Sequence, residues 1–315
     1  MLIVGSQRYG SSGVLGARPG RAATGWSELA TGRADAATDL AAGATALADR
    51  ATDALIAEAL LTPKPALVDR RGSGAHRDLD LTRLLRSAAS LREGFRQMAE
   101  CAAGQTPVQS LREELARIGR DAEQQMLAAA GGSNAHRGAI WVLGLLVAAR
   151  QMCGAAAVAN EVADVAARIA RLPDRFAPPA PSSNGSRVSE KYGVPGARGE
   201  AQDGFPHVTK IGLPALHRAR HEGVPEAYAQ LDALMAIMAR LPDTCLLHRG
   251  GMEALEAAQA GAQAVVDTGG TSTAEGWRAL LALDAELLAR WASPGGCADL
   301  LAACLFLDDG DQWKS

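Results

Sequence analysis

Apolar residues recur at intervals of three and four positions along most of the chain from Thr38 onward. This spacing places them on one face of an α-helix. The first such segment contains Leu40, Ala44 and Leu47 and ends before Pro63, which cannot continue a helix. Later segments with the same period are 81–98, 108–126, 135–152, 159–172, 225–241, 250–266, 274–292 and 294–307. No segment alternates β-branched and polar residues, so the pattern predicts an all-α fold, a single multi-helix, bundle-like domain.

Two stretches lack this period. Residues 1–37 are rich in Gly, Ser, Arg and Ala, and we interpret them as a flexible N-terminal extension that precedes an all-α domain of residues 38–315. Residues 173–214 are predicted to form a long functional loop, since unstructured stretches of this length are usually functional or disordered. The second half of this loop carries Arg198 and Glu200 between glycines, which favours a segment folded over a ligand. A plain linker is the alternative.

Composition narrows the function classes. Hydrophobic residues make up 48% of the chain and aromatic residues 4%, with 34 glycines, which favours closely packed helices with small side chains. The formal net charge of -3 gives no global field for nucleic acid or an anionic membrane, so neither is expected as a partner. The five cysteines form no CxxC pair, which is typical of a reducing compartment. No apolar run is long enough for a membrane span or signal peptide, and a cytoplasmic location is expected.

Three predicted helix starts carry small or capping residues, and two of them add an adjacent His and Arg. The segments are "SNAHRGAI", "LHRGGMEAL" and "SPGGCADLL". Free backbone N–H groups at such starts bind phosphate, and arginine adds charge-assisted bonds. Plain helix capping would explain any one of them, but their combination with Lys64 and the Arg70–Arg71 pair favours a polyphosphate ligand. The residues predicted to bind it are Lys64, His76, Asn134, Arg137, Arg198, Arg249, Gly250, Gly251, Gly295 and Gly296.

Several acidic residues lie near these starts. Mg²⁺ binds one or two carboxylates together with ligand phosphates, so Asp78, Asp80 and Asp243 are candidate metal ligands. Asp80 would equally serve as the cap of the helix that begins at Leu81. Glu58 is either an exposed helical residue or an inward-facing ligand. The chain contains no P-loop, no complete dinucleotide fingerprint and no zinc-ligand spacing.

Five ordered motifs together resemble the triphosphoribosyl-dephospho-coenzyme A synthase family. They are "LLTPKPALVDRRGSGAHRDLDL", "SNAHRGAIWVLGLL", "GARGEAQDGFP", "DTCLLHRGG" and "SPGGCADLLAACLFL", and they cover roughly residues 40–307. The stretch "VDRRGSGAHRDL" is most similar to the malonate decarboxylase branch of this family. The chain departs from the family at Ala66, where Gly is common, and at Ala135, Arg137 and Cys245.

The resemblance implies an enzyme, a pentosyltransferase that joins ATP to 3'-dephospho-CoA and releases adenine. The product, 2'-(5''-triphosphoribosyl)-3'-dephospho-CoA, would pass to a transferase that loads an acyl carrier subunit. The reaction builds oxocarbenium character at the ribose, which a carboxylate stabilises. The expected catalytic residues are Asp78, His136 and Glu200, of which His136 or Glu200 is the base. A nucleotide-binding assembly factor and a Mg²⁺-dependent nucleotide hydrolase are the alternatives.

Overall fold

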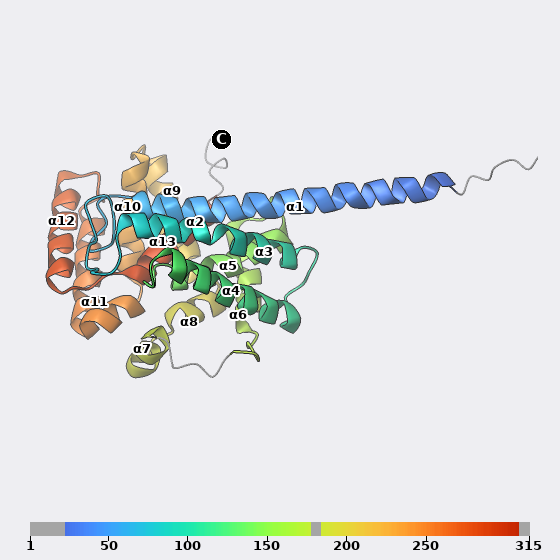
Figure 1. The fold of residues 1–315 in the computed structure, drawn as a ribbon. Helices are drawn as coiled ribbons and strands as arrows, with labels where there is room; N and C mark the ends of the chain where they lie inside the picture. The colour runs from blue at the N-terminus through green and yellow to red at the C-terminus, as the bar shows by residue number, and fades with distance from the viewer. Residues whose placement is uncertain (1–22, 178–183, 309–315) are drawn as a thin grey trace, which may run out of the picture. The chain divides into compact units, whose positions relative to one another are not determined.

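The computed structural model describes the backbone of residues 23–177 and 184–308, and side chains from Leu40 onward. The chain divides into residues 1–40 and 41–315, and the description below concerns the second unit. The described residues form no strand, which confirms the all-α prediction. The helices, drawn in Figure 1, are α1 (Ala23–Leu60), α2 (Leu81–Ser90), α3 (Arg92–Ala102), α4 (Gln109–Ala129), α5 (Arg137–Cys153), α6 (Ala159–Arg171), α7 (Asn184–Tyr192), α8 (Gly196–Gln202), the π-helical turn η1 (Val208–Gly212), α9 (Leu213–His221), α10 (Glu226–Met238), α11 (Thr244–Asp267), α12 (Ala274–Ala289) and α13 (Gly295–Leu307).

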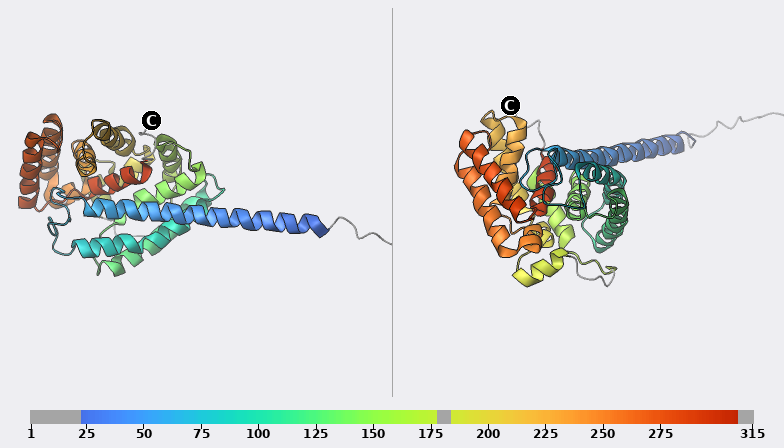
Figure 2. Two further views of the ribbon diagram at one scale, coloured as in Figure 1. Left: turned by 90° about the horizontal axis from the view of Figure 1, so that it is seen from above. Right: turned by 60° about the vertical axis from the view of Figure 1, so that its left-hand side comes forward.

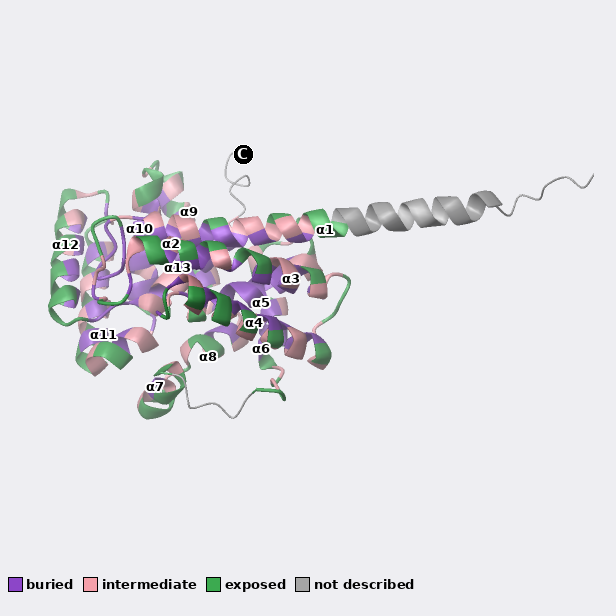
Figure 3. Cartoon of the chain, viewed as in Figure 1, coloured by how far each residue is buried: buried purple, intermediate pink, exposed green. Residues whose placement is uncertain are grey.

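Helices α5 and α13 form the centre of the core. Of the 17 residues of α5, eleven are buried, because its sequence is apolar on nearly every side. Helices α3, α6 and α13 pack directly against it. Figure 3 shows the buried residues of α5 and α13 in purple, with exposed residues on the outer faces of α11 and α12. A side chain at Gly144 of α5 would lie 2.6 Å from the sulfur of Met98, so this glycine lets α3 and α5 approach closely.

Helices α11 and α12 form an antiparallel pair at one end of the unit, as the two views of Figure 2 show. A Cβ atom on Gly261 would come within 2.6 Å of Leu283, so the pair depends on a small residue at the crossing. None of the helices in the described part of the chain is long and apolar enough to cross a membrane.

The prediction of a long loop over residues 173–214 is wrong for most of its length. Helices α7 and α8, the turn η1 and the start of α9 occupy this segment, and residues 178–183 lie outside the described residues. Helix α7 has nine residues and buries only Val188, and α8 has seven residues. Helices this short contain too few buried positions to repeat at three-and-four spacing. Of the predicted extension, residues 1–22 lie outside the described residues, and the backbone of residues 23–37 is the first part of α1.

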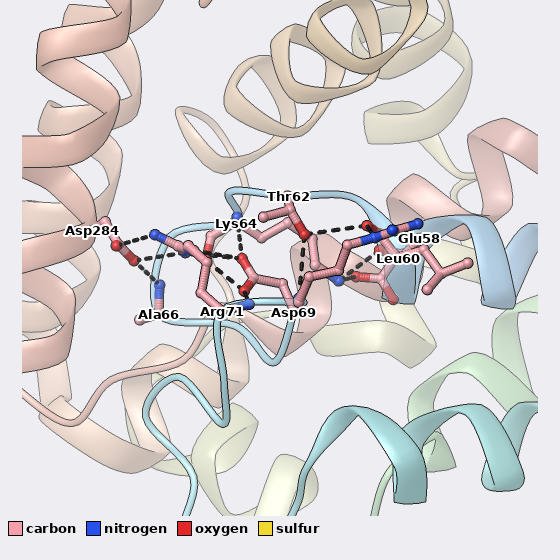
Figure 4. A network of polar contacts seen from close by, with 9 residues as sticks. Glu58, Leu60, Thr62, Lys64, Ala66, Asp69, Arg71 and Asp284 are labelled. Carbon is pink, nitrogen blue, oxygen red and sulfur yellow. Dashed lines mark hydrogen bonds and ion pairs between the residues drawn. The ribbon is translucent and has the colours of Figure 1, made fainter.

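The segment between α1 and α2, residues 61–80, is tied to itself and to α12 (Figure 4). Asp69 accepts hydrogen bonds from the backbone N–H of Lys64 at 2.9 Å and of Arg71 at 2.7 Å. Asp284 of α12 accepts from the Ala66 N–H at 2.8 Å and from Arg71 Nη1 at 2.6 Å. Arg71 is therefore held by two carboxylates and is not available to a polyphosphate.

Ala66 and Gly74 of this segment both have a left-handed backbone, but only Gly74 has no room for a side chain. Ala66 and Gly74 both have φ of 53°, and the Ala75 N–H donates to the Ala66 carbonyl at 2.9 Å. A Cβ on Gly74 would lie 2.4 Å from that carbonyl oxygen. Ala66 therefore adopts a conformation that favours the glycine common in the resembled family.

Exchanging these two side chains should change stability in opposite directions. Ala66→Gly relieves the left-handed strain and should raise the free energy of unfolding by up to about 1 kcal/mol. Gly74→Ala adds strain and a backbone clash and should lower it by about 2–4 kcal/mol. Urea denaturation of the three proteins measures both values. Destabilisation by Ala66→Gly would contradict this account of the segment.

Candidate active site

A buried ion pair joins the end of α1 to the segment that follows it. Glu58 and Lys64 are 5% and 1% exposed, and Lys64 Nζ lies 2.5 Å from Glu58 Oε1 and 2.6 Å from the Glu58 carbonyl (Figure 4). Of the two interpretations of Glu58, the structure supports the one in which it faces inward, and its partner there is Lys64. The Lys64 amine points at Glu58 and is not open to a phosphate. Removing one partner of such a pair leaves a buried charge, which costs about 3–5 kcal/mol.

His136 lies beside this ion pair at the start of α5. It is 4% exposed, and its Nδ1 shares a hydrogen bond with Ser87 Oγ at 2.6 Å. Its Nε2 is buried and has no hydrogen-bond partner among the described residues. Burial, and then the charge of Lys64, lower the pKa of His136 to about 3. His136 is therefore a neutral imidazole near pH 7.

Asp299 of α13 lies against the first turn of the same helix. The Ala139 N–H of α5 donates to its carboxylate, and a Cβ on Gly138 would lie 2.0 Å from Asp299 Oδ2. Burial raises the pKa of Asp299 well above its usual range, and the charges of Glu58 and Asp243 raise it further. Burial and these two charges therefore favour the protonated form of Asp299. Its place beside Cys297 and Gly296 was visible in the sequence, but its convergence with α5 was not.

Asp243 joins the starts of two helices that are far apart in the sequence. Its carboxylate accepts from the Cys245 N–H of α11 at 2.7 Å and from the Cys297 N–H of α13 at 2.9 Å. The predicted helix start at Gly295 and Gly296 is confirmed. Asp243 occupies an amide there that we expected to bind phosphate. Asp243 is thus a buried cap at two helix N-termini, and the structure does not bring it to Asp78 or Asp80 as a metal site.

Arg249, His76 and Ser293 form a chain of contacts at the edge of this cluster. Arg249 donates from Nη1 to the Ala75 carbonyl at 2.9 Å, and its Nη2 lies 3.1 Å from His76 Nδ1. Since a guanidinium only donates, Nδ1 accepts, and the Nε2–H of His76 donates to Ser293 Oγ at 2.9 Å. Burial and then Arg249 lower the pKa of His76 to about 4.

The predicted helix start at Gly250 and Gly251 needs correction. Helix α11 begins earlier, at Thr244, with Asp243 as its cap. Gly251 has φ of 66° and ψ of -159°, which interrupts the helix just after Arg249. The helix therefore restarts after Gly251, and a first turn with its own N–H groups begins there.

The remaining predicted residues lie at the surface or serve local structure. Asp80 caps α2 by accepting from the Arg83 N–H at 2.8 Å, so the capping interpretation is the one that the structure supports. The Asp78 side chain is exposed. Asn134 accepts from the Arg137 N–H at 3.2 Å, and Arg137 donates to Glu123 at 2.6 Å.

Glu200 is not brought to the cluster around His136. It is buried on α8, where it accepts from the backbone N–H of His207 at 2.9 Å and lies 2.7 Å from His207 Nδ1. Arg198 lies on the exposed face of the same helix. The residues that sequence reasoning missed are Ser87 and Ser293. Nothing beside Ser87 distinguishes it from other serines, whereas Ser293 opens the motif "SPGGCADLL" but was not assigned a contact with His76.

The predicted metal ligands do not converge. Among the described residues, no group of three His, Cys, Asp or Glu side chains is placed to hold a metal ion. Asp80 and Asp243 accept helix N–H groups, whereas no hydrogen bond joins the Asp78 carboxylate to a described residue. Mg²⁺ needs few protein ligands when it arrives with phosphates, so a single free carboxylate fits that mode of binding.

Comparisons with known proteins agree on one family. Residues 44–315 match the family described as CitG: ATP:dephospho-CoA triphosphoribosyl transferase. A Pseudomonas fluorescens protein named probable 2-(5''-triphosphoribosyl)-3'-dephosphocoenzyme-A synthase is 57% identical over 262 residues, which cover 82% of this chain and 89% of that protein. A Klebsiella pneumoniae protein with this name, without "probable", is 54% identical over 258 residues, 82% of this chain and 92% of its own. No solved structure matches the chain.

The low pKa of His136 predicts how stability depends on pH. An unfolded imidazole titrates near 6.5, and native His136 at about 3, so between these values only the unfolded state binds this proton. Stability due to His136 is therefore complete above pH 6.5 and is lost as the pH falls, by up to about 1.4 kcal/mol per pH unit. His136→Asn keeps a hydrogen-bonding group for Ser87, removes the titrating imidazole and should reduce this slope. Urea denaturation between about pH 7 and 5 tests this, and parallel curves would refute it.

Proposed function

The chain belongs to the ATP:dephospho-CoA triphosphoribosyl transferase family, and from this premise we propose its reaction and its role. It transfers the triphosphoribosyl group of ATP to the ribose 2'-hydroxyl of 3'-dephospho-CoA. The C1'–N9 bond of ATP breaks, and a bond from C1' to the 2'-oxygen forms. The hydroxyl proton leaves, and the departing adenine takes up a proton. The triphosphate remains intact in the product.

One observation carries this proposal at the level of residues. A neutral imidazole with an unpartnered, buried nitrogen and a carboxyl group whose pKa is raised by burial border the first turn of the same helix, α5. The reaction needs one group that accepts a proton and one that supplies it. His136 Nε2 acts as the base in the tautomer in which Nδ1–H donates to Ser87. Asp299 is the acid that protonates adenine.

The polyphosphate end of ATP is bound near Arg249 and the helix restart after Gly251. Arg249 is exposed, and the first turn beyond Gly251 offers backbone N–H groups. Asp78 is the proposed carboxylate for Mg²⁺, because its side chain is exposed and makes no hydrogen bond with a described residue. Bound Mg²⁺ neutralises part of the phosphate charge. Lys64, Glu200 and Asp243 are withdrawn from the contacts with substrate, since each is engaged by another protein group.

The product is the prosthetic-group precursor for the acyl carrier subunit of malonate decarboxylase, and a separate carrier-protein transferase consumes it in the cytoplasm. The similarity of "VDRRGSGAHRDL" to the malonate branch supports this assignment. Family membership favours a synthase over a nucleotide hydrolase or an assembly factor without activity.

The reaction is tested by its products. Incubation with ATP, Mg²⁺ and 3'-dephospho-CoA should release adenine and give the adduct mass, and chelation of Mg²⁺ should stop both. Asp78→Asn should raise the Mg²⁺ concentration needed for half-maximal rate without changing the products. Release of phosphate in place of adenine would support the hydrolase, and no turnover would support the assembly factor.

Asp299→Asn separates an acid from a structural cap. The amide oxygen can still accept the Ala139 N–H, so the fold should persist, but the side chain has no acidic proton. Adenine release should fall by about 10²–10⁴-fold in kcat. Thermal unfolding of the variant provides the control for folding. A folded variant that releases adenine at the wild-type rate would remove Asp299 from the mechanism.

A further inference from the structure

Arg112 of α4 is a buried cation without a bonded counter-ion. Arg112 is 7% exposed, and its Nε has no hydrogen-bond partner among the described residues. No carboxylate of the described chain lies within ion-pair distance of it. Buried charges in proteins are normally paired and hydrogen-bonded, so this arrangement is costly for the protein alone. Burial accordingly lowers the pKa of Arg112.

Trp141 of α5 lies next to this guanidinium. The Arg112 Cζ is 5.1 Å from the centre of the indole ring, which provides a cation–π contact. The indole N–H donates to the Ala197 carbonyl of α8 at 3.1 Å. Trp141 therefore holds the backbone beside Arg198 close to Arg112. The charge of Arg198 is near enough to lower the pKa of Arg112 as well.

The acidic groups near Arg112 are already engaged. Asp174 accepts from Arg120 Nη1 at 2.6 Å, and Glu113 accepts from Arg175 Nε at 2.5 Å. Both acids act on Arg112 only through space. Arg198 makes no ion pair with a described residue. Two positive side chains thus remain beside Trp141 without bonded anions, and one of them is buried.

We propose that Arg112, Arg198 and Trp141 form a subsite for a phosphate group of ATP or 3'-dephospho-CoA. The inference rests on the proposed function, because that function brings both phosphate-bearing molecules to α5. Trp141 lies five residues after His136, which is about 7.5 Å along a helix. The subsite is therefore on the helix that carries the proposed base. A phosphate oxygen would supply the acceptor that Arg112 Nε lacks, through a charge-assisted bond.

Binding of each molecule alone identifies the source of the phosphate. Calorimetric titration of ATP, 3'-dephospho-CoA and inorganic pyrophosphate into wild type and Arg112→Met compares the dissociation constants. We expect Arg112→Met to weaken one of the two nucleotides, and pyrophosphate, by at least about tenfold. Arg112→Lys should weaken them also, because it keeps the charge and loses the planar fork. Arg117→Met is the matched control, since Arg117 is an exposed arginine of the same helix.

Stability distinguishes a ligand site from a structural arginine. Removal of a buried cation without a partner should leave the melting temperature of Arg112→Met unchanged or raise it. A lower melting temperature with unchanged dissociation constants would overturn the subsite, and so would wild-type affinity in both Arg112→Met and Arg198→Met. Pyrophosphate keeps this test independent of catalysis. If the wild type releases no adenine, the proposed reaction is refuted. If Arg112→Met nevertheless binds pyrophosphate more weakly than the wild type does, the subsite is retained.

Discussion

The N–H groups of a helix start that lies inside the protein need acceptors, and the arrangement of this fold depends on how they are supplied. Asp243 accepts N–H groups from both α11 and α13, and Asp299 accepts one from α5. These carboxylates fix three helices against one another where their N-termini meet. The same contacts place Asp299 against the first turn of α5, the helix that has His136 as its N-cap. The position of the candidate site is therefore a result of helix capping.

Most of the buried ionisable groups in this region are either paired or have a pKa shifted toward the neutral form. Glu58 and Lys64 neutralise each other, His76 and His136 are held neutral, and burial raises the pKa of Asp299. A polar cluster of this kind can be buried because few of its members carry an uncompensated charge. Arg249 lies at its edge, and Arg112 and Arg198 lie apart from it; none of these three has an ion-pair partner among the described residues. Anionic substrates would meet positive charge first and neutral hydrogen-bonding groups deeper in.

The sequence predicted the helices with long apolar stripes and missed those without one. Helix α5 was clear because nearly every side is apolar, whereas α7 buries a single valine. For the site, features set by a local motif could be predicted, and contacts between distant parts of the chain could not. The helix start at Gly295 and the place of His136 at the start of a helix followed from local motifs. The partners of Lys64, Asp243 and Glu200 could not be predicted from the sequence. Each of these side chains bonds to a group that only the folded chain brings within reach. Ala66 is the intermediate case, since its left-handed backbone explains why glycine is common there in the family.

The contacts between residues 61–80 and Asp284 also bear on how the chain is made. Ala66 and Arg71 depend on a carboxylate that lies more than two hundred positions later. A ribosome synthesises about 5–20 residues per second, so this acceptor emerges many seconds after the segment it serves. During that interval the segment beside Lys64 has its own internal bonds to Asp69 but lacks its anchor on α12. The early part of the site is therefore completed only when nearly the whole chain has been translated.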